Sequence, residues 1–414
     1  RREIEPVAPA DFMRFLLDWQ HATPDTHLRG PDALAVVLAQ LEGFEAPAGA
    51  WESQLLPARI AGYDMAWLDA LCGAGRIAWA RLRAPSAGRH AGPVRASPIV
   101  LLPRSQLRTW RALAAYAAEA PALSSRAQAV AEFLAQHGAS FFDDIAEGAR
   151  LLGVELENAL GELVGAGMAG ADSFAGLRAL LRPAAQRRHA RYRRLARHLL
   201  GGIQDVGRWS LVPHAVASSP TFPHPTPPPH AGEGDERAVR VGGGNDAPPH
   251  AGEGERLEHV ARVLLRRWGV VFWKLLEREA AWLPPWRELR RVYQRLEARG
   301  EIRGGRFVEG IAGEQFALAE AVEALRRVRK RAPAGTCVAI SGADPLNIVG
   351  SVLPGTRVPA LAGSRIVYRD GIPVVVRVAN DVALLASLSP HAERTARSVL
   401  ADQVSRRLPA GRLQ

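Results

Sequence analysis

The chain has 414 residues, enough for two to four domains, and 47% of them are hydrophobic. No apolar stretch is long enough to cross a bilayer, and the opening "RREIEPVAPADF" lacks the apolar core of a signal peptide, so we expect no membrane partner. A net charge of +11 and an isoelectric point near 10.7 indicate a polyanionic partner instead.

The lysines exclude one class of enzyme from this chain. The sequence has only Lys274, which is followed by Leu, and Lys330, which is followed by Arg. A Walker A loop requires Lys followed by Ser or Thr, which reach the nucleotide phosphates and Mg²⁺. We therefore expect no P-loop ATPase and no bound cofactor in this chain, which starts at Arg1 and is expected to be a piece of a longer protein.

The two cysteines give no sign of a metal site. Cys72 and Cys337 are far apart and match no metal-ligand spacing. So few cysteines are typical of a reducing compartment, and we predict a cytoplasmic location with no bound metal.

Three segments along the chain share one pattern. In each, a helix with leucines three or four residues apart is followed by a glycine and then by Ile or Met at the start of a short strand; the segments are Met65–Leu82, Leu156–Ser173 and Leu289–Phe307. Further helix candidates precede each one. Helix, helix, helix, strand, strand is the order of a winged helix-turn-helix module, and its recurrence predicts a tandem array.

An arginine-rich segment, Ala175–Arg208, follows the second of these modules. Between Arg182 and Asp205 it contains no acidic residue, and Arg187, Arg191 and Arg194 lie in its middle. The segment is either a helix that contacts phosphates or simply a solvated helix face. The absence of acids four residues away favours phosphate contact.

The next segment, residues 213–254, is rich in Pro, Gly and His and contains "PPHAGEG" twice. It has too few large apolar residues to fold, so we predict a disordered linker. After the third module the pattern changes to strands, "TCVAI" and "SRIVYRDGIPVVVRV", in which Asp370-Gly371 predicts a two-residue hairpin turn.

We therefore predict a mainly α chain with α+β modules, in which tandem winged helix-turn-helix domains are followed by a small β-rich domain with helical flanks. The first winged-helix-like domain is predicted over residues 1–110 and the second, with the arginine-rich helix, over residues 111–212. The linker covers residues 213–254, the third winged-helix domain residues 255–320 and the β-rich domain residues 321–414.

Several unusual stretches of sequence resemble a known family. "GRWSLVP", "RGEIRGGRFVEGIAGEQFALAEAV", "SGADPLNIVG" and "SRIVYRDGIPV" occur in the order found in the C-terminal region of the large helicase-related (Lhr) family, and "LEGFEAPAGAWESQLLPARI" upstream also resembles it. The family usually has Ala where this chain has Gly342. These are superfamily 2, ATP-dependent DNA helicases of bacteria and archaea.

The resemblance implies that this chain assists an ATP-dependent motor on nucleic acid. The motor domains, with their ATP and Mg²⁺, would lie upstream of this chain. The winged-helix domains and a barrel-like C-terminal domain would form part of the channel that guides single-stranded DNA or an RNA–DNA hybrid during DNA repair.

The residues of the third module suggest how it would contact nucleic acid. In a winged helix the third helix enters the groove and the wing touches the backbone. Arg287, Arg291 and Arg295 recur every fourth residue on that helix, and Arg303 and Arg306 lie on the wing. Trp286 either stacks on an unpaired base or belongs to the core.

Two other functions remain open. Some tandem winged-helix arrays excise damaged bases or uracil, which requires a pocket for the flipped base and a carboxylate or polar residue. Asp344 and Asp370 are the candidate carboxylates, although Asp344 also fits a turn before Pro345. The other alternative is an oligomerisation scaffold. A homo-oligomer is compatible with each of these functions.

Overall fold

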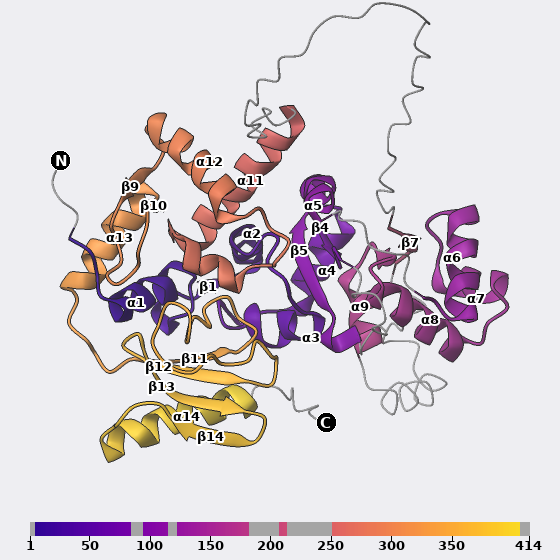
Figure 1. The fold of residues 1–414 in the computed structure, drawn as a ribbon. Helices are drawn as coiled ribbons and strands as arrows, with labels where there is room; N and C mark the ends of the chain where they lie inside the picture. The colour runs from indigo at the N-terminus through magenta and orange to yellow at the C-terminus, as the bar shows by residue number, and fades with distance from the viewer. Residues whose placement is uncertain (1–4, 84–93, 115–121, 182–206, 213–250, 406–414) are drawn as a thin grey trace, which may run out of the picture.

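The computed structural model describes residues 5–83, 94–114, 122–181, 207–212 and 251–405 (Figure 1). Arg187, Arg191 and Arg194 lie outside the described residues, as does most of the predicted linker. The described part consists of three helical modules, each with a small sheet, and a four-stranded sheet near the C-terminus.

The first module surrounds a three-stranded antiparallel sheet in the order β2-β5-β4. Asp64 caps its third helix through a hydrogen bond from the Ala66 amide. A short parallel pair, β1–β3, lies beside it. The elements are β1 (Leu28–Arg29), α2 (Pro31–Gln40), β2 (Ala46–Pro47), α3 (Ala48–Ala50) with a π-helical turn at Trp51–Leu55, β3 (Ile60–Ala61), α4 (Met65–Gly73), β4 (Ile77–Ala80), β5 (Pro98–Pro103) and α5 (Leu107–Ala114).

The second module has three consecutive helices followed by a smaller, two-stranded sheet. Its strands are brought together from distant parts of the chain: Ala171 pairs with Trp209, and the Trp209 side chain is completely buried. The "GRWSLVP" word thus supplies the second strand of this wing. The elements are α6 (Ser125–His137), α7 (Phe142–Gly148), α8 (Gly153–Gly165), β6 (Ala169–Ala171), α9 (Phe174–Leu181) and β7 (Trp209–Leu211).

The third module has its sheet in the order β8-β10-β9, and the antiparallel strands β9 and β10 form its wing. The Gln315 side chain holds the loop between the two wing strands by accepting hydrogen bonds from the amides of Phe307 and Val308. The first helix begins earlier than the predicted domain start at residue 255. The elements are α11 (Ala251–Trp268), β8 (Val270–Val271), a 3₁₀ helix (Trp273–Arg278), α12 (Trp286–Ala298), β9 (Arg303–Gly305), β10 (Gln315–Ala317) and α13 (Ala319–Lys330).

The C-terminal domain is an open antiparallel sheet, β11 (Cys337–Ser341), β12 (Arg365–Arg369), β13 (Ile372–Val378) and β14 (Asp381–Leu384), packed against α14 (Pro390–Ser405). The predicted hairpin turn is confirmed, since Asp370 and Gly371 have φ of 48° and 82°. The barrel-like expectation is wrong. Closing a barrel would require β11 to pair with β14, whereas these strands form the two edges of the sheet.

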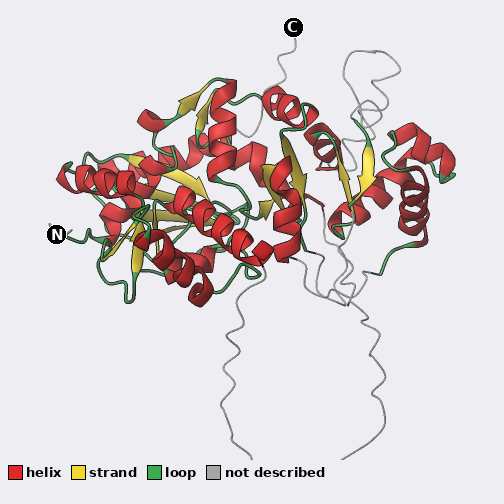
Figure 2. Ribbon diagram, turned by 90° about the horizontal axis from the view of Figure 1, so that it is seen from above, coloured by secondary structure: helices red, strands yellow, loops and turns green. Residues whose placement is uncertain are grey.

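The N-terminal helix α1 (Pro9–Trp19) joins parts of the chain that are distant in sequence (Figure 1). Helices flank the small sheets throughout the described part (Figure 2). Helix α1 packs against α13, and Arg14 donates a hydrogen bond to the Arg331 carbonyl at 2.7 Å. Just before it, Val7 forms a parallel bridge with Val308 beside the wing. One hydrophobic core therefore contains α1, the third module and residues of the C-terminal domain.

Candidate functional site: an arginine face and a pocket

The predicted arginines of the third module are all exposed, and we call Arg287, Arg291, Arg295, Arg303 and Arg306 the arginine face. The opposite side of α12 is buried, since Leu289, Val292 and Leu296 are in the core. Glu297, near the end of α12, accepts a hydrogen bond from the Gly304 amide at 3.1 Å. This bond ties the helix to the wing, so both sets of arginines belong to one rigid unit.

Acidic residues neutralise only part of this surface. Arg287 lies 3.8 Å from Glu288, and Arg291 also has a partner. Arg303 and Arg306 form no ion pair with any residue that the structure describes. Arg295 on α12 likewise forms no ion pair with a described residue, so uncompensated positive charge lies on both the helix and the wing.

Trp286 lies against the core of the module. Its ring centroid is 5.8 Å from that of Tyr293 and 6.3 Å from that of Phe316. The side chain is half-buried. This packing accounts for a tryptophan at the start of α12, and its stacking on a base stays a prediction.

Asp344 is completely buried in an ion pair with Arg59 from the first module. The two Arg59 nitrogens Nη1 and Nη2 donate to its two carboxylate oxygens at 2.8 and 2.9 Å. Its Oδ1 also accepts a hydrogen bond from the Leu346 amide, which is the turn that the sequence allowed as an alternative. This carboxylate therefore joins the C-terminal domain to the first module.

Asp370 holds a loop in place. Its carboxylate accepts hydrogen bonds from three successive amides, those of Ala334, Gly335 and Thr336, at 2.8–3.2 Å. Neither Asp370 nor Asp344 is among the residues that line the pocket described next.

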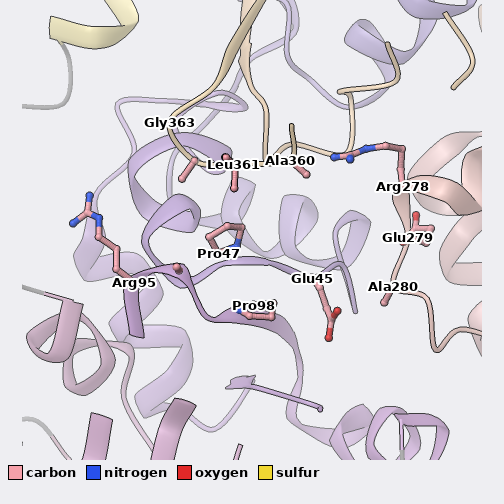
Figure 3. A pocket seen from close by; sticks show the side chains of 12 residues that line it. Glu45, Pro47, Arg95, Pro98, Arg278, Glu279, Ala280, Ala360, Leu361 and Gly363 are labelled. Atoms are coloured by element: carbon pink, nitrogen blue, oxygen red, sulfur yellow. The ribbon is translucent and has the colours of Figure 1, made fainter. Parts of the chain in front are cut away.

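A pocket of about 600 Å³ lies where the first module, the third module and the C-terminal domain meet (Figure 3). The first module contributes Glu45 and Pro47 from one segment and Arg95, Ala96 and Pro98 from another. Residues 278–280, after the 3₁₀ helix, and the loop 360–363, before β12, form the remaining walls. No single module contains this site, because each wall comes from a different part of the chain.

Glu45 is the pocket carboxylate that is not held in an ion pair among the described residues. The other, Glu279, is bound by Arg267 and accepts a hydrogen bond from Trp268 Nε1 at 2.7 Å. Glu45 Oε1 accepts a hydrogen bond from Trp282 Nε1 at 3.1 Å. In Figure 3 its carboxylate is seen between Pro98 and Ala280.

Burial raises the pKa of Glu45 above its ordinary value, although the Trp282 hydrogen bond and the charges of Arg81 and Arg83 act in the opposite direction. The direction is typical of a carboxylate that exchanges protons in a site, as well as of one that is merely buried. Among the predicted site residues Glu45 was missed, although it lies inside the quoted word "LEGFEAPAGA". An acid between Phe44 and Ala46, directly before a strand, was the available signal.

Two arginines bring positive charge to the pocket. Arg278 donates from Nη2 to the Asp344 carbonyl at 2.9 Å, and burial lowers its pKa. Its Nε is buried and has no hydrogen-bond partner among the described residues. Arg95 is exposed and points away from the centre of the pocket in Figure 3. The pocket thus has a half-buried arginine in one wall and an exposed one at its mouth.

Within the described ranges, no three His, Cys, Asp or Glu side chains gather as a metal site. A search of the same ranges finds no helix long and apolar enough to span a membrane.

Comparison with known proteins identifies relatives. Models of the winged-helix domain of the large helicase-related protein match residues 7–104 and residues 250–337. The "Lhr helicase/uracil glycosylase" of Escherichia coli is 30% identical over 90% of this chain and 24% of its own length. The "Lhr helicase/ probable uracil glycosylase" of Mycolicibacterium smegmatis is 28% identical over 100% of this chain and 26% of its own length.

The chain thus spans about a quarter of the length of these curated relatives. Among solved structures, it is similar to the DNA glycosylase AlkZ of Streptomyces sahachiroi, with a TM-score of 0.47 and 13% identity, over 97% of each chain.

Proposed function

The chain belongs to the large helicase-related (Lhr) family, whose C-terminal region it matches, and we propose that it binds nucleic acid and guides a strand for an ATP-dependent motor located upstream in the full-length protein. ATP and Mg²⁺ belong to that motor. The partner is single-stranded DNA or an RNA–DNA hybrid, and the setting is DNA repair in the cytoplasm.

The observation that supports strand guiding best is the arginine face. Guanidinium groups on an exposed helix and wing contact phosphates without reading the sequence, which suits a protein that must move along a strand. Arg295 on the helix and Arg303 and Arg306 on the wing have no acidic partner among the residues of the described structure, so their charge is available to a phosphate.

Replacing Arg287, Arg303 and Arg306 by Ala is expected to weaken binding to a fluorescent single strand and to flatten its salt dependence. Each lost phosphate contact reduces the slope of log K against log salt by about 0.7 on single strands. The measurement is fluorescence anisotropy at several salt concentrations.

The matched control replaces Arg394 and Arg397 on α14, which are also exposed. An equal loss in this control would contradict the assignment to the third module. Stable multimers without any affinity for the strand would support the scaffold function instead.

A second function, removal of uracil from DNA, is supported by two observations. The pocket has the size of a small-molecule site and contains a carboxylate outside any ion pair among the residues that the structure describes. The Escherichia coli relative is named a uracil glycosylase, and the Mycolicibacterium smegmatis relative a probable one.

Incubation with a single strand that carries one central uracil is expected to leave an abasic site, which alkali then cleaves. The same strand with thymine serves as the control and stays intact. An alkali-stable uracil strand, under conditions in which the protein binds it, would remove this second function and leave strand guiding in place.

A further inference from the structure

The pocket and the residues at its mouth suit a nucleotide that has left the base stack. Its volume of about 600 Å³ lies in the range of about 300–1,000 Å³ typical of small-molecule sites. Pro47, Pro98 and Leu361 offer flat or apolar surfaces to a base. We propose that this pocket receives a flipped pyrimidine nucleotide and that Glu45 is the catalytic carboxylate. This proposal rests on the uracil excision proposed above.

The position of Glu45 suits the removal of a proton from water. Trp282 holds Oε1 through a hydrogen bond, and Trp282 is itself packed edge-on against the buried Trp110, at a centroid distance of 6.1 Å. The carboxylate is therefore fixed in orientation. Its second oxygen has no hydrogen-bond partner among the described residues, so it is available to a water molecule.

The reaction balances with water as the only co-reactant. The oxygen of the water forms a bond to C1′ of the deoxyribose, and its proton passes to the Glu45 carboxylate. The bond between C1′ and N1 of uracil breaks, and its electron pair leaves on the base, which then takes up a proton from solvent. Glu45 returns its proton to solvent and becomes a carboxylate again. The products are free uracil and an abasic sugar with a hydroxyl at C1′.

The charges around the pocket favour this step. The departing base becomes negative before it is protonated, and the half-buried Arg278 side chain in the pocket wall stabilises that charge. The Glu45 carboxylate also stabilises the positive charge that develops on the sugar. Glu279, the other carboxylate in the wall, is held by Arg267 and is not available for either task.

Leu361 lies at the mouth of the pocket, and its side chain is 58% exposed. Apolar side chains that project from a surface enter DNA between base steps and unstack them. A leucine at the mouth would fill the space that the flipped nucleotide leaves in a duplex. In a single strand no such space has to be filled.

The ionisation of Glu45 sets the expected pH dependence. The reaction requires the charged carboxylate, and burial raises its pKa, so the rate falls with acidification at a higher pH than for an ordinary glutamate. The charged groups that face it are Arg81 and Arg83, with Arg278, Glu279 and Arg95 in the surrounding walls.

The test uses the full chain with Glu45→Gln, which retains an oxygen for the Trp282 hydrogen bond. The single-turnover excision rate on a uracil-containing single strand should fall at least about 100-fold, the usual contribution of a general base. Binding to the same strand should stay within about twofold, in keeping with a role in chemistry and not in phosphate contact. The control, Asp381→Asn on the exposed β14, should change neither quantity.

A second variant, Leu361→Ala, should reduce excision from a uracil-containing duplex much more than from the single strand. The excision rate of the unaltered chain, measured as a function of pH, should fall at low pH. A Glu45→Gln variant that excises uracil at the unaltered rate would overturn the role of Glu45, while the excision function itself would stand. An unaltered chain that binds the strand without excising uracil would overturn both.

Discussion

Replacing Asp344 by Asn is expected to lower the free energy of unfolding by about 3–5 kcal/mol, the usual cost of removing one partner of a buried ion pair. Asp344 and Arg59 are completely buried and joined by two hydrogen bonds. Asn keeps the volume but leaves the guanidinium with an uncompensated charge. The measurement is urea unfolding followed by tryptophan fluorescence.

The matched control is Asp381→Asn, because Asp381 is exposed and the same change of charge there should alter stability by less than about 0.5 kcal/mol. An unchanged stability of the Asp344 variant, together with lost excision of uracil, would return Asp344 to a catalytic role. The pair therefore separates a carboxylate that holds domains together from one that acts on substrate.

The second large effect is expected at the hairpin turn that touches α1. Replacing Gly371 by Ala should destabilise the chain by about 2–5 kcal/mol, from a positive φ that costs an L-residue about 1–2 kcal/mol and from overpacking that adds about 1–3 kcal/mol. An added Cβ would lie 2.0 Å from the carbonyl oxygen of Ala10. Thermal unfolding gives the measurement.

Gly300→Ala isolates the backbone contribution. Gly300 has a φ of 77°, and no atom lies within 4 Å of an added Cβ. The free energy of unfolding of the Gly300→Ala variant should therefore fall by only about 1–2 kcal/mol. Equal losses in the two variants would show that the contact between the turn and α1 contributes nothing.

What the sequence predicted correctly rests on local signals. Leucines three or four residues apart, a glycine and a short strand indicate one module at a time, and the turn at Asp370-Gly371 depends on those two residues alone. The exposure of the arginine face follows equally from its spacing. Each of these features is decided within about ten residues of chain.

The parts that were missed depend on distant pairings. Asp344 was a candidate for catalysis because its ion pair with Arg59, 285 positions away, leaves no mark on the surrounding sequence. Glu45 was passed over for the same reason, since its partner Trp282 is 237 positions away. The barrel was inferred from resemblance, and only the pairing of strands shows that the sheet stays open.

The placement of α1 has a consequence for the order of folding. Contacts between α1 and α13, and between Val7 and Val308, join segments separated by about three hundred residues, and such closures are slow because a long loop must be ordered first. During synthesis α1 leaves the ribosome long before its binding surface exists. The pocket, whose walls extend from residue 45 to residue 363, is therefore completed only after nearly the whole chain has been made.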